Sequence, residues 1–421
     1  MRVPRWAVRA FSPLAVRNFR FYFIGQTMSV SGTWMQRVAQ SWLVLELTGS
    51  GTAIGLVTAV QFLPMLLLAP FGGVIADRFD KRRLLLVTQA IAAVLAAALG
   101  LLVVFDVVRL WMVFVLAGAL GLVSSVDNPT RQTFVLEMVG RDNLTSAVSL
   151  NAVLVNLARV LGPAAAGALI VTVGLGPCFL INAATYLAII VALVLMRVAE
   201  LQAVPPQERR AGQLREGLRY VRSTPAVLTP LVMMGVVGML AYEFQVILPL
   251  IAKFTFGGDA GTYAALTACM GGGAVVGGLV TASRKARPPV ALSRTAALFG
   301  ATQLLASFAP TLVTEYFAMV ALGAASIGFL ALGNATLQLS ATPEMRGRVM
   351  GLWAVAFLGS TPIGGPIVGW IGEHIGPRYG LGLGGVATLL AAMFAYRRLL
   401  AIEPDGVEIT QTPGPHEKLG P

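Results

Sequence analysis

The sequence predicts an all-α membrane protein of about twelve transmembrane helices in two related halves. Of its 421 residues, 56% are hydrophobic and only 12% are charged. An average soluble domain carries about 25% charged residues, which help to cover its surface. Lipid accepts apolar side chains on the outside of a protein, so this composition excludes a water-soluble fold.

The apolar runs are typical of helices rather than strands. Residues 84–105 and 177–196 are apolar on every face, whereas a membrane barrel alternates apolar and polar residues over segments of about 10 residues. Only helices and closed barrels satisfy their backbone polar groups in lipid, so helices are indicated. The predicted spans cover about 20–47, 52–76, 83–105, 109–129, 146–172, 176–196, 227–251, 262–282, 290–309, 312–338, 348–373 and 379–397.

The basic residues predict the orientation in the membrane. The 31 Lys and Arg residues outnumber the acids and give a net charge of +12. With a cytoplasmic N-terminus, most of them fall in the N-terminal segment, in the connections after even-numbered spans and in the tail. This positive-inside pattern predicts a multi-pass protein of the cell inner membrane with both termini in the cytoplasm. It also explains the positive charge without a nucleic-acid partner.

The sequence offers little equipment for catalysis or metal binding. Its two cysteines, Cys178 and Cys269, lie in apolar runs, and its two histidines are His374 and His416. These residues form neither a disulfide framework nor a metal-ligand set. We therefore expect no enzymatic activity and no bound metal.

The longest polar stretch separates six predicted spans from six. It contains Leu214, Leu218 and Val221 at helical spacing among arginines, which fits either a basic amphipathic helix on the inner membrane surface or a plain soluble linker helix. The composition of the tail predicts disorder. The predicted parts are a cytoplasmic N-terminal segment, an N-terminal six-helix bundle, a cytoplasmic linker, a C-terminal six-helix bundle and a cytoplasmic tail, over 1–19, 20–197, 198–226, 227–398 and 399–421.

An internal repeat relates the two halves. The fifth span contains Gly162 and Pro163, and the eleventh contains Gly365 and Pro366 at the corresponding position. Upstream, GRDNLTSAVSL matches PEMRGRVMGL. Parallel repeats of this kind are a standard transporter architecture, with the substrate path between the halves.

The connection after the second span, GGVIADRFDKRR, carries a glycine, an acid and a cluster of cations. The glycine lets helices approach closely, and Asp77 can accept hydrogen bonds at a helix start. The cations can pair with acids across a gate on the inner side. This loop closely resembles the signature loop of the major facilitator superfamily, although an ordinary positive-inside loop also carries cations. The resemblance implies the major facilitator fold, in which twelve transmembrane helices form two pseudo-symmetric six-helix bundles.

Three further stretches extend the resemblance to the drug:proton antiporter branch of that superfamily, which includes the enterobactin exporter. They are NFRFYFIGQTMSVSGTWMQRVAQSWLVLELTGSGTAIGLV, DNPTRQTFVLEMVGRDNLTSAVSLN and PEMRGRVMGL. In the family, the loop acid and a cation four residues on form a cluster with an acid at the inner end of helix 4, and these positions correspond to Asp77, Lys81 and Asp127. The predicted gating motif consists of Gly73, Asp77, Arg78, Lys81, Arg82, Arg83, Asp127, Arg346 and Arg348.

Gly162, Pro163 and Gly167 in the fifth span resemble the antiporter motif of exporters. In the family this motif is thought to bend helix 5 and to seal the outer side, which implies outward transport. Gly and Pro also serve bending and close packing in many membrane helices, so a purely structural role is the alternative.

Charged residues at membrane depth are costly and therefore predict function. Arg159 is close to the midplane, where it can counter an anionic substrate or anchor a neighbouring helix. Arg37 and Glu243 occupy the outer halves of the first and seventh spans, which face each other in the family, and we expect them to pair when the outer gate closes. The fourth such residue is Glu315, near the outer end of the tenth span.

Proton coupling needs an acid in the membrane. Many members of the branch carry an acid after the glycine of the first span, but here Gly32 is followed by Thr33. Glu243 is therefore the first candidate, since removal from water favours the neutral form of a carboxyl group. Asp127 and Glu315 are the other candidates, and a Glu243 that extends to the interface without binding a proton is the alternative.

Amide side chains in the spans predict helix contacts or a polar cavity, because an amide that faces lipid lacks hydrogen-bond partners. Together with the two arginines, they give the predicted substrate-cavity residues Arg37, Gln36, Gln40, Gln61, Asn156, Arg159, Gln245, Asn334 and Gln338.

The predicted function is export of a small amphipathic compound, such as a drug, a siderophore or another metabolite, by proton antiport with alternating access. The proton motive force drives this process without a cofactor, and the partners are the substrate, protons and the lipid bilayer around a monomer. The alternatives are a proton-coupled uptake symporter and a membrane substrate sensor without transport.

Overall fold

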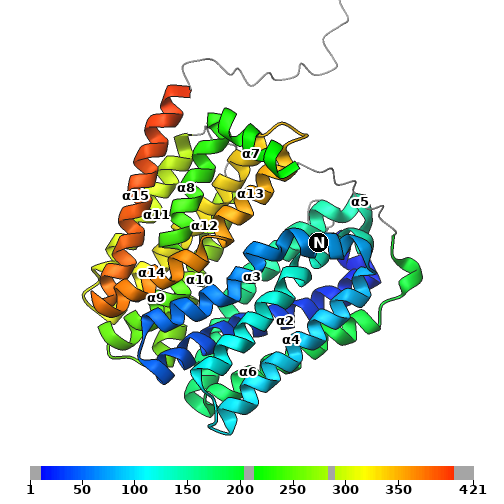
Figure 1. Cartoon of the computed structure of the whole chain (residues 1–421), viewed down its shortest axis with the longest axis horizontal. Coiled ribbons are helices and arrows are strands. Elements are labelled where there is room, and N and C mark those ends of the chain that lie inside the picture. Colours follow the sequence, from blue (N-terminus) through cyan, green and yellow to red (C-terminus); the bar gives the residue numbers. More distant parts are fainter. Residues whose placement is uncertain (1–10, 203–212, 283–289, 403–421) are drawn as a thin grey trace, which may run out of the picture.

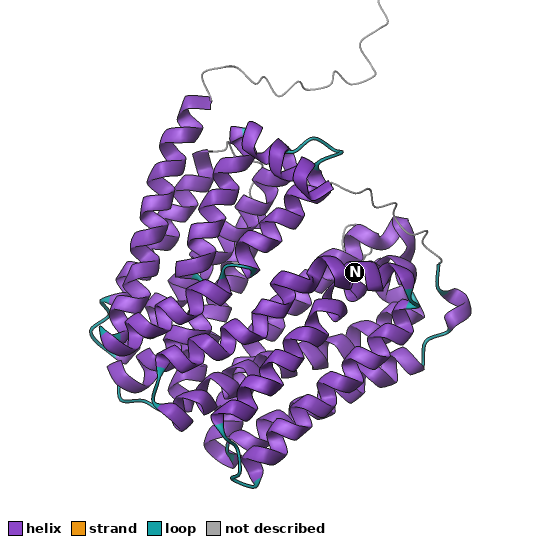
Figure 2. Cartoon of the chain, viewed as in Figure 1, coloured by secondary structure: helices purple, strands orange, loops and turns teal. Residues whose placement is uncertain are grey.

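The computed structural model describes residues 11–202, 213–282 and 290–402. Every regular element in these ranges is a helix (Figure 2). Figure 1 shows two groups of helices that meet at the lower left and separate toward α7 (Gln213–Ser223). We call the end of the molecule that carries α7 the linker face and the other end the opposite face. The predicted disordered tail lies outside the described residues.

The first bundle begins with a 3₁₀ turn, η1, and its last long helix is followed by a second turn, η2. Its elements are η1 (Ser12–Ala15), α2 (Arg17–Thr48), α3 (Gly51–Arg78), α4 (Lys81–Val104), α5 (Leu110–Val173), α6 (Leu175–Val194) and η2 (Val198–Glu200). The second bundle contains two interrupted crossings. Its elements are α8 (Pro225–Ala241), α9 (Phe244–Leu250), η3 (Ile251–Thr255), α10 (Ala260–Ala282), α11 (Val290–Ser307), α12 (Leu312–Ser340), α13 (Arg346–Leu358), α14 (Thr361–His374) and α15 (Pro377–Ile402).

The described residues form twelve membrane crossings, as predicted. The described residues contain nine segments that are long and apolar enough to span a membrane. One of these is α5, which makes two crossings because it is kinked at Gly140. Polar residues lower the hydropathy of α2 and α11, which supply the remaining two crossings.

The fourth and fifth crossings differ from the prediction. The sequence predicts spans over 109–129 and 146–172 with a polar connection, but the helix continues from Leu110 to Val173 and only Gly140 leaves the helical conformation. Gly140 has φ 70°, which glycine adopts without strain. The prediction of a loop is wrong because polar residues at the edge of the membrane can still form helix.

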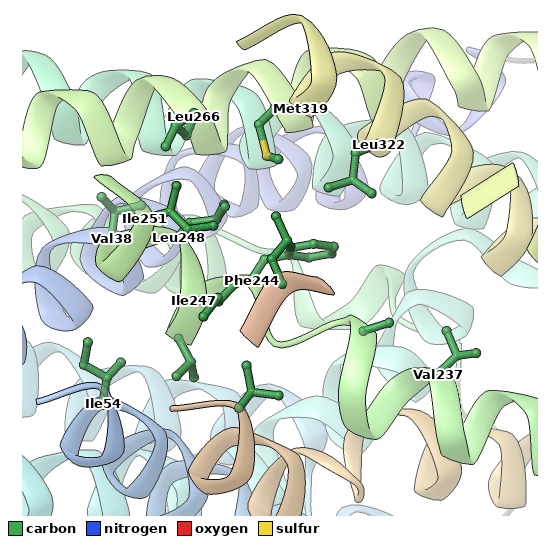
Figure 3. Packing of buried hydrophobic residues seen from close by; sticks show 14 of the residues in the cluster. Val38, Ile54, Val237, Phe244, Ile247, Leu248, Ile251, Leu266, Met319 and Leu322 are labelled. Carbon is green, nitrogen blue, oxygen red and sulfur yellow. The ribbon is translucent and has the colours of Figure 1, made fainter. Parts of the chain in front are cut away.

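The bundles lock together at the opposite face. Helix α3 packs along α14, and α5 packs along α10. The short helix α9 contacts α2 and α3 of the first bundle and α10, α14 and α15 of the second. Figure 3 shows part of this apolar packing, which includes Val38, Ile54, Phe244, Ile247, Leu248, Ile251, Leu266, Met319 and Leu322.

The seventh crossing, formed by α8, α9 and η3, is the most enclosed of the nine described segments that are long and apolar enough to span a membrane. In its most apolar window, which lies within Pro225–Thr255, 61% of the residues are buried inside the protein. The corresponding share in the other described spans ranges from 28% to 50%. Among these nine segments, this crossing therefore has the largest share of its residues packed inside the protein.

The linker contains the predicted helix with amphipathic spacing, and it packs against the second bundle. Val221 on α7 is buried, whereas Leu218 is exposed. Glu216 forms an ion pair with Arg348 of α13, with 2.9 Å between carboxylate oxygen and guanidinium nitrogen. The linker helix is thereby attached to the C-terminal bundle through α13.

Candidate functional site

Two crossings of the second bundle are broken at neighbouring points. Tyr242 and Glu243 separate α8 from α9, and Gly359 and Ser360 separate α13 from α14. A Cβ atom added at Gly238 would lie 2.9 Å from the Ser360 Oγ, so the two breaks are close together. Discontinuous helices at membrane depth are where transporters bind substrates and ions, because the exposed helix ends offer polar backbone groups.

Glu243 lies at this pair of breaks. Its side chain is 3% exposed, and its Oε1 atom has no hydrogen-bond partner in the described part of the protein. Thr361, in the first turn of α14, is within hydrogen-bonding reach of the carboxyl group. A Cβ atom at Gly364 would lie 3.1 Å from Oε1. The carboxyl group is therefore buried against the beginning of α14.

Arg37 does not meet Glu243. Its guanidinium carbon lies 4.7 Å from the centre of the Trp34 ring, and Arg159 approaches the same ring at 5.1 Å. No ion pair among the described residues joins Arg37 to Glu243, although the bundles are closed at the opposite face. The predicted pairing is wrong for this conformation, because Glu243 is turned toward α14.

The signature loop caps two helices. Asp80, not Asp77, is the N-cap of α4 and accepts a hydrogen bond from the backbone N–H of Arg83 at 2.7 Å. Asp77 belongs to the last turn of α3, which runs to Arg78, so its predicted place at a helix start is wrong. Arg82 donates through Nε to the carbonyl of Leu193 at 2.6 Å and so binds the end of α6. The loop thereby fixes the packing of α4 and α6.

The predicted contact between the loop cation Lys81 and the helix 4 acid Asp127 is not formed. Lys81 instead forms an ion pair with Glu137, with 2.6 Å between Nζ and Oε1. Glu137 lies in the segment predicted to be a loop, so its position beside Lys81 was not expected. Its only sequence signal was its acidic charge near the inner end of the fourth span.

Asp127 is fully engaged within the first bundle. It accepts hydrogen bonds from Thr88 Oγ1 at 2.8 Å and from Gln89 Nε2 at 2.7 Å. It also forms an ion pair with Arg131, one turn further along α5. These nearby partners explain why Asp127 does not reach Lys81.

A seam of glycines joins the bundles near the opposite face. A Cβ atom at Gly55 would lie 2.3 Å from the carbonyl oxygen of Gly365, and one at Gly369 would lie 2.2 Å from that of Gly51. Residues four apart lie on one side of a helix, so the four glycines let the backbones of α3 and α14 touch. We call Gly51, Gly55, Gly365 and Gly369 the glycine seam.

Glu373 closes the end of the glycine seam. Its Oε2 atom accepts hydrogen bonds from Ser50 Oγ at 2.6 Å, from Thr52 Oγ1 at 2.6 Å and from the backbone N–H of Thr52 at 2.9 Å. Ser50 and Thr52 stand at the N-terminus of α3, where the helix dipole favours an anion. A carboxylate of one bundle thus caps a helix of the other.

We expect a Glu373→Gln variant to loosen the opposite face. The amide can still accept a hydrogen bond but lacks the charge that favours a helix N-terminus, so the contact weakens by about 0.5–1 kcal/mol at this exposed position. Spin labels at Leu47 and Ile375, measured by electron–electron resonance, should show the separated population rise about two- to fivefold.

Glu46→Gln is the matched control, because Glu46 is also exposed near this face and accepts from Trp42 Nε1 within its own helix. Equal distance distributions for Glu373→Gln and Glu46→Gln would show that the carboxylate does not hold the bundles together.

The residues of the antiporter motif lie in helix contacts. A Cβ atom at Gly162 would lie 2.7 Å from the carbonyl oxygen of Ser31 in α2, and Pro163 is buried. At Gly167 it would lie 2.7 Å from the Cβ of Ala264 in α10. The motif therefore serves close packing both within the first bundle and between the bundles, and its role in export stays a prediction.

The predicted amides are mostly used in helix contacts. Gln36 accepts from Asn182 Nδ2 at 2.5 Å, and Gln40 donates to Gln61 at 3.0 Å. Two others bond within their own helices, Asn156 to the carbonyl of Ala152 and Gln338 to Asn334. Gln245 is partly buried.

Glu315 is a second buried acid. It lies in the first turn of α12 near the opposite face, as predicted, and its side chain is 1% exposed. Neither carboxyl oxygen has a hydrogen-bond partner in the described ranges. It remains a candidate for proton binding, at a place remote from the broken helices.

Broken helices, buried acids and two interlocked bundles together define a polytopic membrane protein of the transporter class. A family model described as a transmembrane secretion effector, MFS_3, matches residues 8–416. The chain therefore belongs to this family of the major facilitator superfamily.

The chain is similar to known exporters and transporters. It is 26% identical to the staphyloferrin A transporter of Staphylococcus aureus (strain NCTC 8325 / PS 47) over 61% of this chain and 65% of that protein, just under two thirds of its length. It is 24% identical to the enterobactin exporter EntS of Escherichia coli O139:H28 (strain E24377A / ETEC) over 85% of this chain and 86% of that protein. These relatives confirm the resemblance to the exporter branch and the prediction that the chain is not an enzyme.

The solved structures support the fold. A bacterial homologue of the human lysosomal transporter Spinster matches with a TM-score of 0.72 at 14% identity, over 92% of this chain and 98% of that chain. This similarity confirms the predicted all-α fold of two six-helix bundles.

Proposed function

We propose that the chain is a secondary transporter that exports small amphipathic compounds by proton antiport with alternating access. It resides in the inner membrane with both termini in the cytoplasm, so that the linker face is cytoplasmic and the opposite face is external. The observation that carries the proposal is the position of Glu243 beside the glycine seam. A Cβ atom at Gly365 would lie 3.1 Å from the carbonyl oxygen of Gly55 and 3.5 Å from Glu243 Oε2.

Glu243 couples protons to the movement of the bundles. When the carboxyl group is ionised, the N-terminal end of α14 stabilises its negative charge. Protonation removes this interaction from the helix that forms one side of the glycine seam. The two protonation states thus differ in their preference for the closed seam, which is what a proton needs in order to shift the equilibrium between conformations.

The signature loop holds the linker face in the alternate conformation. In that conformation the charged side chains of the loop, including Asp77, pair across the inner gate with charged side chains at the start of α13, where Arg346 and Arg348 lie. In the present conformation Arg348 is engaged by Glu216. Exchange of such partners between two conformations is the usual way in which charged gates act as switches.

The relatives support export and suggest the substrates. Two of them are a staphyloferrin A transporter and an enterobactin exporter, and others are a multidrug efflux pump and a macrolide efflux protein. A drug, a siderophore or another small amphipathic metabolite fits the proposal equally.

Flux in proteoliposomes tests the proposal. Vesicles that contain the purified protein are loaded with a panel that includes a macrolide and a siderophore, and a pH gradient is imposed. An antiporter moves its substrate against the direction of proton flow, whatever the orientation of the protein, and a proton ionophore stops this movement. Movement in the direction of proton flow would indicate a symporter, and binding without flux would indicate a sensor; either result contradicts the proposal.

A further inference from the structure

Two arginines share one indole ring inside the membrane. Arg37 of α2 and Arg159 of α5 lie 4.7 Å and 5.1 Å from the centre of the Trp34 ring, measured from the guanidinium carbon. All three side chains are partly exposed. No ion pair among the described residues includes either arginine, and the Nε atom of Arg159 is buried without a hydrogen-bond partner.

This arrangement lacks an anion. Two cations beside one another repel, and each is costly at membrane depth. A cation–π contact stabilises a guanidinium less than a counter-charge does, so the shared ring does not offset the cost of two cations at membrane depth. The buried acids Glu243 and Glu315 do not supply that charge, because Glu243 is turned toward α14 and Glu315 lies at the opposite face.

The pair lies where the bundles meet, away from lipid. A Cβ atom at Gly271, in the middle of α10, would lie 2.9 Å from the carbonyl oxygen of Arg159. The phenol of Tyr242, at the end of α8, is close enough to interact electrostatically with Arg159. The guanidinium groups therefore belong to the interface between the two halves, where transporters of this architecture bind their substrates.

Aromatic rings accompany the arginines. Tyr242 stacks edge-on against Phe357 with 5.0 Å between ring centres and lies 5.1 Å from Phe299 and 6.0 Å from Phe244. These rings come from the second bundle, whereas Trp34 comes from the first. A compound held by the arginines would have an aromatic surface beside it for its apolar part.

We propose that Arg37, Trp34 and Arg159 form the anion-binding part of the substrate site, and that the substrate is an amphipathic organic anion with a carboxylate or a similar group on an aromatic or apolar body. Guanidinium groups bind carboxylates through two parallel hydrogen bonds, and stacking on Trp34 fixes the planes of both groups. The assignment of the substrate class rests on the proposed transport function. It excludes a preference for cationic drugs.

Three probes that share one dansyl ring test the charge preference. Dansylglycine is anionic, dansylcadaverine is cationic and dansylamide is neutral, and each can be titrated by fluorescence against the purified protein in detergent. We expect dansylglycine to bind about tenfold or more tightly than dansylcadaverine, with dansylamide between them. Equal or tighter binding of dansylcadaverine, or no binding of dansylglycine up to millimolar concentration, overturns the proposal.

Arginine variants test the site. Arg37→Gln and Arg159→Gln should each weaken dansylglycine about tenfold while dansylamide changes by less than about twofold, and Arg159→Lys should keep part of the anion preference. Arg17→Gln is the matched control, because Arg17 stacks on Phe21 at 4.9 Å in the same helix but at the linker face. An unchanged anion preference in both glutamine variants overturns the assignment.

The two failures can be told apart, because binding in detergent needs no gradient. Anion preference without flux in proteoliposomes would contradict the transport function and leave the anion site standing. Antiport of a cationic compound would support the transport function and contradict the anion site.

Discussion

Transport driven by a pH gradient is expected to fall to the level of protein-free liposomes in a Glu243→Gln variant, while downhill exchange of substrate continues. Glutamine has nearly the shape of the protonated acid but cannot release a proton. The variant therefore stays in one protonation state, and a proton gradient can no longer favour one conformation over the other. Exchange needs only the movement of the loaded protein, so it should survive. Initial rates with and without an imposed gradient measure both activities.

Glu315→Gln is the matched comparison for this test. Glu315 is also a buried glutamate, and neither of its carboxyl oxygens has a hydrogen-bond partner among the described residues, but it lies away from the glycine seam. We expect its variant to keep gradient-driven transport. If Glu243→Gln still concentrates substrate, whereas Glu315→Gln or Asp127→Asn does not, proton coupling belongs to one of those acids instead.

Closure of the opposite face is expected to fail in a Gly55→Val variant, and all transport should stop with it. A Cβ atom at Gly55 would lie 2.3 Å from the carbonyl oxygen of Gly365, so the two backbones must move apart. Overpacking of this kind costs about 1–3 kcal/mol, which shifts the population by about 5- to 150-fold toward the state open at the opposite face. Unlike Glu243→Gln, this variant should lose downhill exchange as well.

Cysteine accessibility measures this shift. A cysteine at Val38, which is 2% exposed in the closed conformation, is placed in a background without Cys178 and Cys269. A membrane-impermeant maleimide added outside cells should label it faster in Gly55→Val. Gly272→Val is the control, because a Cβ atom at Gly272 of α10 meets nothing within 4 Å. Unchanged labelling together with normal exchange would show that the glycine seam is not the outer gate.

The fold could be predicted because lipid demands a long apolar run for each crossing. That demand weakens at the ends of helices, which is why the helical segment around Gly140 appeared to be a loop. The charged residues at membrane depth, such as Arg159 and Glu243, could be found for the same reason. The partners of charged residues could not be found in this way, because they depend on the distances between helices. Lys81, for example, pairs with Glu137 and not with Asp127.

The glycine seam shows a different limit. The spacing of four between Gly51 and Gly55, and between Gly365 and Gly369, is a signal for close helix packing. The chain contains 46 glycines, and many other pairs could fit a similar spacing. Only the three-dimensional arrangement shows which pairs face each other across the bundles.

The enclosure of the seventh crossing separates the proposed proton site, Glu243, from the lipids. Helices such as α4 and α6 are less enclosed, with 33% and 39% of the residues in their most apolar windows buried, so a thicker or thinner membrane acts on them more directly, by tilting or by local deformation of lipid. The crossing that carries Glu243 is surrounded mainly by protein and keeps its environment when the thickness changes. Membrane composition should therefore alter how fast the bundles rock, while the affinity for protons stays nearly constant from one membrane to another.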